Sequence, residues 1–121
     1  MGRLQAAEEI GDIDMPLTHD FKETIRARAQ EEPEFRQALL REATECFITG
    51  DLATGKAVLR DYVNATVGFQ GLEKGTHIPA KSLMRMLGPN GSPSAANLSN
   101  ILTVLQRTEG VRFAVHTADR R

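Results

Sequence analysis

Residues 68–106 read GFQGLEKGTHIPAKSLMRMLGPNGSPSAANLSNILTVLQ, and this stretch decides the fold of the chain. It predicts a short helix that carries Phe69 and Leu72, a second short helix over residues 79–87, and a longer third helix that Gly110 ends. The third helix has apolar residues at i, i+3, i+4 and i+7, which are Leu98, Ile101, Leu102 and Leu105. A helix as short as the second is marginal in water on its own, so neighbouring elements must hold it.

The order of these helices is that of a helix-turn-helix, in which the second helix enters the major groove of DNA. The core of this motif is expected over residues 67–106, and the turn is THIP, residues 76–79. Several apolar side chains are expected to join the two short helices and to face the core. These are Leu72, Ile78, Leu83, and Met86 or Leu87.

The second helix then leaves Lys81, Ser82 and Arg85 on its outer side. Because Lys81 and Arg85 are four residues apart, they share a face and could contact phosphates or guanine edges. The alternative is that both are ordinary solvated charges. Met84 and Met86 are expected to fill gaps in the core or at its edge rather than to form a binding surface.

The loop after the second helix, GPNGSP, brings backbone N–H groups to the start of the third helix. Ser92 or Ser94 is expected to cap that helix. A helix N-terminus favours negative charge, so this loop is a candidate contact for a phosphate.

The N-terminal half predicts further helices within residues 20–66. Asp20 is a candidate N-cap, Pro33 suits a first helical turn, Gly50 is a helix stop, and Asp51 caps the helix that follows. Cys46, the only cysteine, lies on an apolar helix face and is expected to be a buried thiol. Residues 1–16 show no apolar periodicity and are expected to form a flexible arm, which leaves 17–121 as a single helical domain.

The C-terminal residues 111–116 alternate between apolar and polar side chains, which predicts a β-strand. Val111, Phe113 and Val115 would share one face of it. A lone strand cannot satisfy its own backbone groups, so we expect it to pair with a second copy and to form a homodimer. The alternative, which stays open, is that this tail packs singly against its own domain or frays.

The charge distribution and the absence of several motifs limit the classes of function that the sequence allows. The net charge of −1 hides an acidic N-terminal half and a basic C-terminal half, and the latter is the better candidate to meet a polyanion. No stretch is long and apolar enough to span a membrane, so a cytoplasmic location is expected. The three histidines, His19, His77 and His116, are scattered, and no nucleotide-binding motif is present. We therefore expect no enzyme activity, metal or cofactor.

The same residues carry a resemblance. KSLMRML, the G-x-P-x-x-x-N-L pattern at residues 91–98, and EGVRFAV resemble the lambda-repressor-like (Xre-type) helix-turn-helix of the addiction-module antidote family. The preceding DFKETIRARAQ, FRQALLREA and GDLATGKAVLRDYVNAT are similar to the helical part that comes before the motif in these proteins. The resemblance covers nearly the whole chain from Met15, and it implies an all-α helix-turn-helix bundle.

The resemblance also implies the site. The recognition-helix positions fall on Ala80, Lys81, Ser82 and Arg85, and the phosphate-facing loop falls on Asn90 to Ser94. Two positions depart from the family pattern. Glu73 stands where a small residue is usual, and its charge near DNA would repel phosphate. His77 stands where glycine is usual, and it would be strained if the backbone there is left-handed.

Two functions follow from the resemblance and the charge pattern. In the first, a dimer binds double-stranded operator DNA as a repressor of its own promoter, and it also neutralises a small RelE-like toxin. In the second, the acidic N-terminal helices form a protein-binding module for such a basic partner, with weak or no DNA binding.

Overall fold

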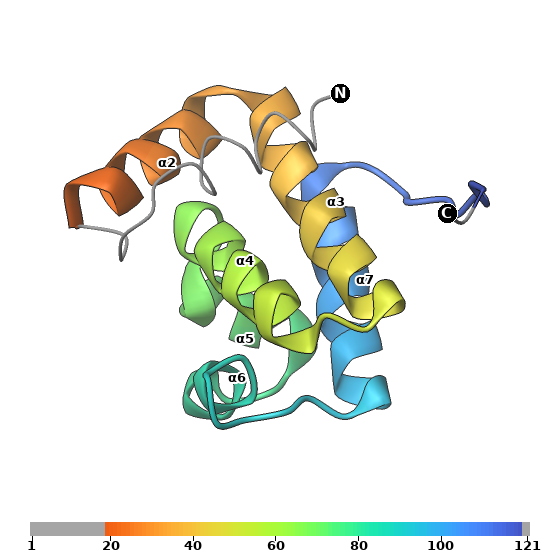
Figure 1. Ribbon diagram of the computed structural model, residues 1–121. Helices are drawn as coiled ribbons and strands as arrows, with labels where there is room; N and C mark the ends of the chain where they lie inside the picture. Colours follow the sequence, from red (N-terminus) through yellow and green to blue (C-terminus); the bar gives the residue numbers. More distant parts are fainter. Residues whose placement is uncertain (1–18, 120–121) are drawn as a thin grey trace.

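In the computed structural model, residues 19–119 are described, and within this range the chain forms six α-helices and no β-strand. The N-terminal half consists of α2 (His19–Glu31), α3 (Pro33–Thr49) and α4 (Leu52–Ala65). The second half consists of α5 (Gly68–Thr76), α6 (Ala80–Met86) and α7 (Ala95–Glu109). Figure 1 shows α6 at the end of the bundle opposite to α2. The predicted all-α class is confirmed for this part of the chain.

The pair α3 and α4 makes the most extensive helix contact of the bundle. Gly50 ends α3 in the left-handed conformation, with φ 96°, and the Asp51 carboxylate accepts a hydrogen bond from the Thr54 N–H at 3.2 Å. Both the stop and the cap were predicted. The two helices approach closely at Gly55, where an added Cβ would lie 2.9 Å from the Phe47 ring. The glycine inside α4 therefore permits the contact.

One hydrophobic core draws on all six helices. Its buried members include a residue from each, namely Ala29, Leu40, Leu59, Leu72, Leu83 and Leu105. Cys46 is only 5% exposed, as predicted, and its Sγ lies 3.8 Å from Glu42 Oε2 in a hydrogen bond within α3. Because α5 and α6 are short, they depend on packing: α5 contacts α4, α6 and α7, and α6 packs mainly against α5.

The strand that we predicted for residues 111–116 is not formed in the described chain. Residues 111–119 have no regular secondary structure, and Figure 1 shows them extending away from the bundle after α7. The Phe113 N–H donates to Gln106 Oε1 at 2.7 Å, and the Phe113 side chain packs against the core. A strand exists only through bonds to a neighbouring strand, and the described residues of this chain offer none.

Two predictions fall partly or wholly outside the described residues. The arm at residues 1–16 lies there, and so does the side chain of Asp20, the predicted N-cap of the first helix. None of the helices in the described range has the length and apolar character needed to cross a membrane.

Candidate functional site

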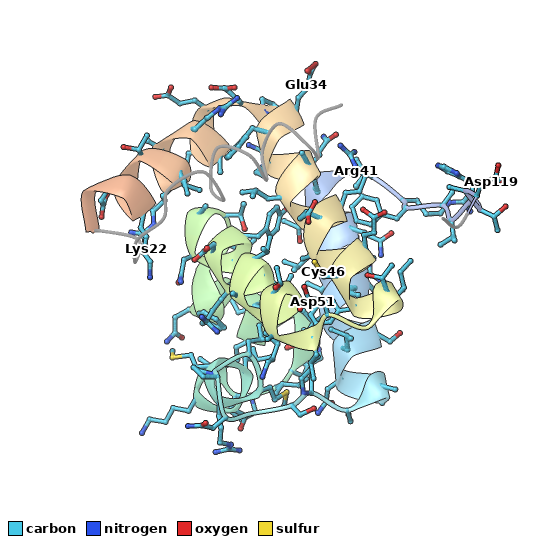
Figure 2. All side chains as sticks on the ribbon, viewed as in Figure 1. Lys22, Glu34, Arg41, Cys46, Asp51 and Asp119 are labelled. Carbon is cyan, nitrogen blue, oxygen red and sulfur yellow. The ribbon has the colours of Figure 1, made fainter. Side chains whose placement is uncertain are left out.

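Of the four contact positions predicted on α6, Lys81, Ser82 and Arg85 lie on or beside the outer face, whereas Ala80 is buried and is not available for contact. Ala80, Leu83 and Leu87 are buried on the inner face, with exposed fractions of 7%, 0% and 0%. Lys81 and Arg85 are exposed and share the opposite face, while Ser82 is half-buried at its edge. In Figure 2, side chains that end in nitrogen project from the α6 end of the molecule away from the bundle. The structure therefore presents two cations of this helix to solvent.

Met84 joins these cations on the outer face. Met84 is 46% exposed, so of the two expected positions, in the core or at its edge, the core is excluded. Met86 is half-buried, as expected of a residue at the core edge. The difference arises because α6 turns residues 80, 83 and 87 inward, which leaves position 84 outside.

A tight turn fixes α6 against α5. His77 has φ 64°, and among the described residues it is the only non-glycine residue with positive φ. Its neighbours hold the turn: the Ile78 N–H donates to Thr76 Oγ1 at 3.2 Å, and Asn100 Nδ2 of α7 donates to the Thr76 carbonyl at 3.1 Å. These bonds stabilise a backbone conformation that a side chain rarely adopts.

Glu73 has a structural partner that the sequence did not reveal. Its Oε1 accepts a hydrogen bond from the Ala80 N–H at 2.8 Å, at the first residue of α6. Pro79, the residue before α6, supplies no side-chain cap. Glu73 therefore caps α6 from the preceding helix, and its negative charge lies at the positive end of the helix dipole. This carboxylate is oriented toward α6, which explains a charged residue in a position where we expected it only to repel phosphate.

Two side chains of α4 form hydrogen bonds to the backbone that follows α6. Lys56, only 5% exposed, donates from Nζ to the carbonyls of Gly91 at 2.6 Å and Gly88 at 3.0 Å. Arg60, one turn further along α4, donates to the Leu87 carbonyl. The loop is also compact, because a Cβ added to Gly91 would lie 1.8 Å from the Arg85 carbonyl oxygen. Only glycine fits at that position.

The predicted loop residues lie together on the surface. Asn90, Ser92 and Ser94 are all exposed. Of the two candidate caps, Ser94 is the one used: its Oγ accepts from the Asn97 N–H at 3.1 Å. The carbonyls of Gly88, Pro89 and Gly91 point toward Lys56, which turns part of the loop backbone inward.

A buried polar cluster lies between α3, α4 and α7. Arg36 Nε lies 2.9 Å from a Glu109 carboxylate oxygen, and the Tyr62 hydroxyl donates to the same carboxylate. Burial and this hydrogen bond raise the pKa of Tyr62 above its ordinary value of 10.0. A pocket of about 340 Å³ opens beside these residues. Arg36 also donates to the Ala29 carbonyl at 3.0 Å, so the cluster ties α2 to the far end of α7.

The three predicted dimerisation residues do not share one environment. Val111 and Phe113 are half-buried, whereas Val115 is 79% exposed. A groove of about 210 Å³ runs between the tail and α3, with Ile48, Phe113 and Val115 among its lining residues. Phe113 therefore packs against its own chain, and of the three predicted residues only Val115 is exposed.

Within residues 19–119 there is no cluster of three or more histidine, cysteine, aspartate or glutamate side chains that could hold a metal ion. Comparison with protein-family models, with curated proteins and with solved structures finds no match for this chain.

Proposed function

We propose that this protein is a sequence-specific DNA-binding transcriptional regulator, an antitoxin-like repressor of its own promoter. The observation that carries the proposal is the outer face of α6. It presents Lys81 and Arg85 from a helix whose opposite face is buried, whose first N–H is capped by Glu73, and whose following loop is held by Lys56. A cationic helix that a scaffold holds rigidly is suited to dock in the major groove.

In this proposal, α5 and α6 are the two helices of a helix-turn-helix and α7 is the helix that follows. Arg85 and Lys81 are suited to guanine edges or phosphates, because both side chains are long, cationic donors. The exposed loop residues Asn90 and Ser92 are suited to phosphate oxygens at the border of the same surface. This division gives the base contacts to the helix and the positioning contacts to the loop.

The proposed regulator is a homodimer. Residues 114–119 form no backbone hydrogen bond within the described part of the chain, and Val115 and Ile48 are exposed beside the groove. An extended segment with unpaired backbone groups is suited to pair with the same segment of a second copy. A two-fold dimer then places two α6 helices on two half-sites of a palindromic operator.

The test is a fluorescence-anisotropy titration with the DNA immediately upstream of the protein's own reading frame, and with a scrambled duplex as the control. We expect a clear preference for the upstream DNA that weakens steeply with salt, because bound phosphates release counterions. The variant K81A/R85A should lose this binding while it keeps its fold, since both residues are exposed. Equal, weak binding of the wild-type protein to both duplexes would contradict the proposal.

A second candidate function is supported by the junction of α2 and α3. Glu31, Glu32 and Glu34 are all exposed there, and the exposed surface of the corner is acidic. Such a surface suits a basic protein, and a small RelE-like ribonuclease toxin is a partner of this kind. The test is complex formation with the protein encoded by the neighbouring reading frame. This candidate would replace the first if the wild-type protein formed that complex, the variant E31Q/E34Q did not, and the wild-type protein showed no preference for its upstream DNA.

A further inference from the structure

The outer face of α6 is not uniformly cationic. Among the described residues, four large apolar side chains are exposed, namely Ile48, Leu52, Met84 and Val115. Three of these lie on α3, on α4 and in the tail, and Met84 lies on α6. A single exposed apolar residue is ordinary on a protein surface, so exposure alone indicates no function for Met84 and its position on the helix has to be considered.

That position is beside the exposed cation Lys81. Met84 follows Lys81 by three residues and Arg85 follows it by four, so both side chains are neighbours of Lys81, one on each side of it. If Lys81 contacts DNA, the exposed side chain of Met84 beside it is within reach of the same groove. Its unbranched, flexible chain is suited to reach an apolar group at the base edges.

The major groove offers one apolar group, the C5-methyl of thymine, and the other base edges present hydrogen-bond donors and acceptors. We propose that Met84 is a specificity-determining residue that recognises thymine through this methyl group. The inference rests on the proposed function and adds to it the base class that one residue selects. Lys81 and Arg85 then supply affinity and guanine or phosphate contacts around a thymine step.

The experiment begins with selection from a duplex library that contains a randomised segment, using the full-length protein. In the enriched duplex, each thymine is replaced in turn by deoxyuridine, which lacks only the C5-methyl group. Dissociation constants are then measured by fluorescence anisotropy for the wild-type protein, for M84Q and for K81A. Glutamine keeps the length of the side chain and the helical preference of methionine, and position 84 is exposed, so M84Q should remain folded.

For the wild-type protein, we expect replacement of one thymine in each half-site to weaken binding by about fourfold, the factor that corresponds to burial of one methyl group. M84Q should bind the thymine and deoxyuridine duplexes equally. The variant K81A should bind the thymine duplex and the deoxyuridine duplex more weakly than the wild-type protein does. The fourfold ratio of the two dissociation constants should remain, because the substitution removes a charge and leaves the contact with the methyl group.

Two kinds of failure are distinguishable. If the library yields an enriched duplex but no replacement weakens wild-type binding, or if the loss persists unchanged in M84Q, Met84 does not read thymine and only this inference is overturned. If no duplex is enriched over the starting library, sequence-specific binding is absent, and the proposed function is overturned together with the inference.

Discussion

At the scale of single residues, the site depends on side chains that shape the backbone. Glu73 supplies the cap that Pro79 does not, and it does so from the preceding helix. His77 occupies a left-handed turn where glycine would be unstrained. Both residues shape the backbone between α5 and α6, and the contribution of Glu73 is favourable because it satisfies the Ala80 N–H.

Replacement of Glu73 by alanine should lower the free energy of unfolding by about 1 kcal/mol, the usual effect of removing a helix cap. E73Q retains an acceptor oxygen and should lose less. Urea-induced unfolding measures both, and Q70A on an exposed position of the same helix is the matched control. Equal stability of E73A and Q70A would show that the hydrogen bond to Ala80 contributes nothing.

At the scale of helices, α6 packs mainly against α5, and two basic side chains of α4 bind the backbone just after α6. The Lys56 ammonium lies among the carbonyls that follow α6, and Arg60 donates to the carbonyl of Leu87. These contacts satisfy backbone acceptors that a short helix and a tight loop would otherwise leave without donors. The presentation of Lys81 and Arg85 thus depends on two basic residues that do not belong to the outer face.

The variant K56M should lower the free energy of unfolding by about 1–3 kcal/mol, because the loop carbonyls lose a donor while they stay partly buried. It should also weaken DNA binding beyond the effect of one lost charge. The control is K74M, which removes the same charge from an exposed position on α5. Thermal unfolding and anisotropy titrations check the two effects, and identical behaviour of K56M and K74M would exclude a role for Lys56 in holding the loop.

The helices themselves could be predicted from the sequence where their signals are local. The stop at Gly50 and the cap at Asp51 depend on neighbours within four residues, and both are confirmed. For the cap of α7 the sequence left Ser92 and Ser94 as alternatives, and Ser94 is the one used. Lys56 and Glu109 could not be predicted, because their partners lie 32 to 73 residues away and no periodic pattern marks them. The prediction of a strand at residues 111–116 was wrong. Alternation of apolar and polar side chains does not distinguish a paired strand from an irregular tail that places one aromatic side chain against the core.

At the scale of the whole molecule, one buried cluster connects the two halves of the chain. Glu109 at the end of α7 binds Arg36 of α3 and Tyr62 of α4, and Arg36 reaches α2. The Glu109 side chain is only 3% exposed, so its charge is stabilised by these partners rather than by water. The N-terminal helices and the helices of the proposed DNA-binding half are therefore linked by polar contacts as well as by the core.

Tyr62 provides a pH test of this cluster, because it is the only tyrosine and the chain has no tryptophan. Burial and Glu109 raise its pKa in the folded protein above 10.0, so the folded state retains the phenolic proton longer than the unfolded state. The stabilisation is complete below pH 10.0 and is lost as the pH rises further.

Tyrosinate absorbance should therefore titrate well above pH 10.0 in the native protein and near that value in concentrated urea. Y62F should show a smaller alkaline loss of thermal stability than the wild-type protein. Coincident titration curves in the native protein and in urea would contradict the buried hydrogen bond.

The assembly also has a direct test. Light scattering should give twice the chain mass of 13.3 kDa for the full-length protein, and truncation after Phe113 should give the mass of one chain. The truncation keeps Phe113 in its own core, so the helices should stay folded. V115P removes one backbone donor from the segment and serves as the smaller perturbation. An unchanged mass in both variants would place the dimer contact elsewhere.

The burial of Cys46 in α3 also makes the molecule its own reporter of local opening. As the only thiol in the chain, and with 5% of its surface accessible, it can react with an alkylating reagent only when α3 separates from its neighbours. The alkylation rate, compared with that of the unfolded chain, then gives the free energy of this opening at one defined residue. If operator DNA slowed the reaction, the slowing would measure how far the bound ligand suppresses fluctuations in a helix remote from α6.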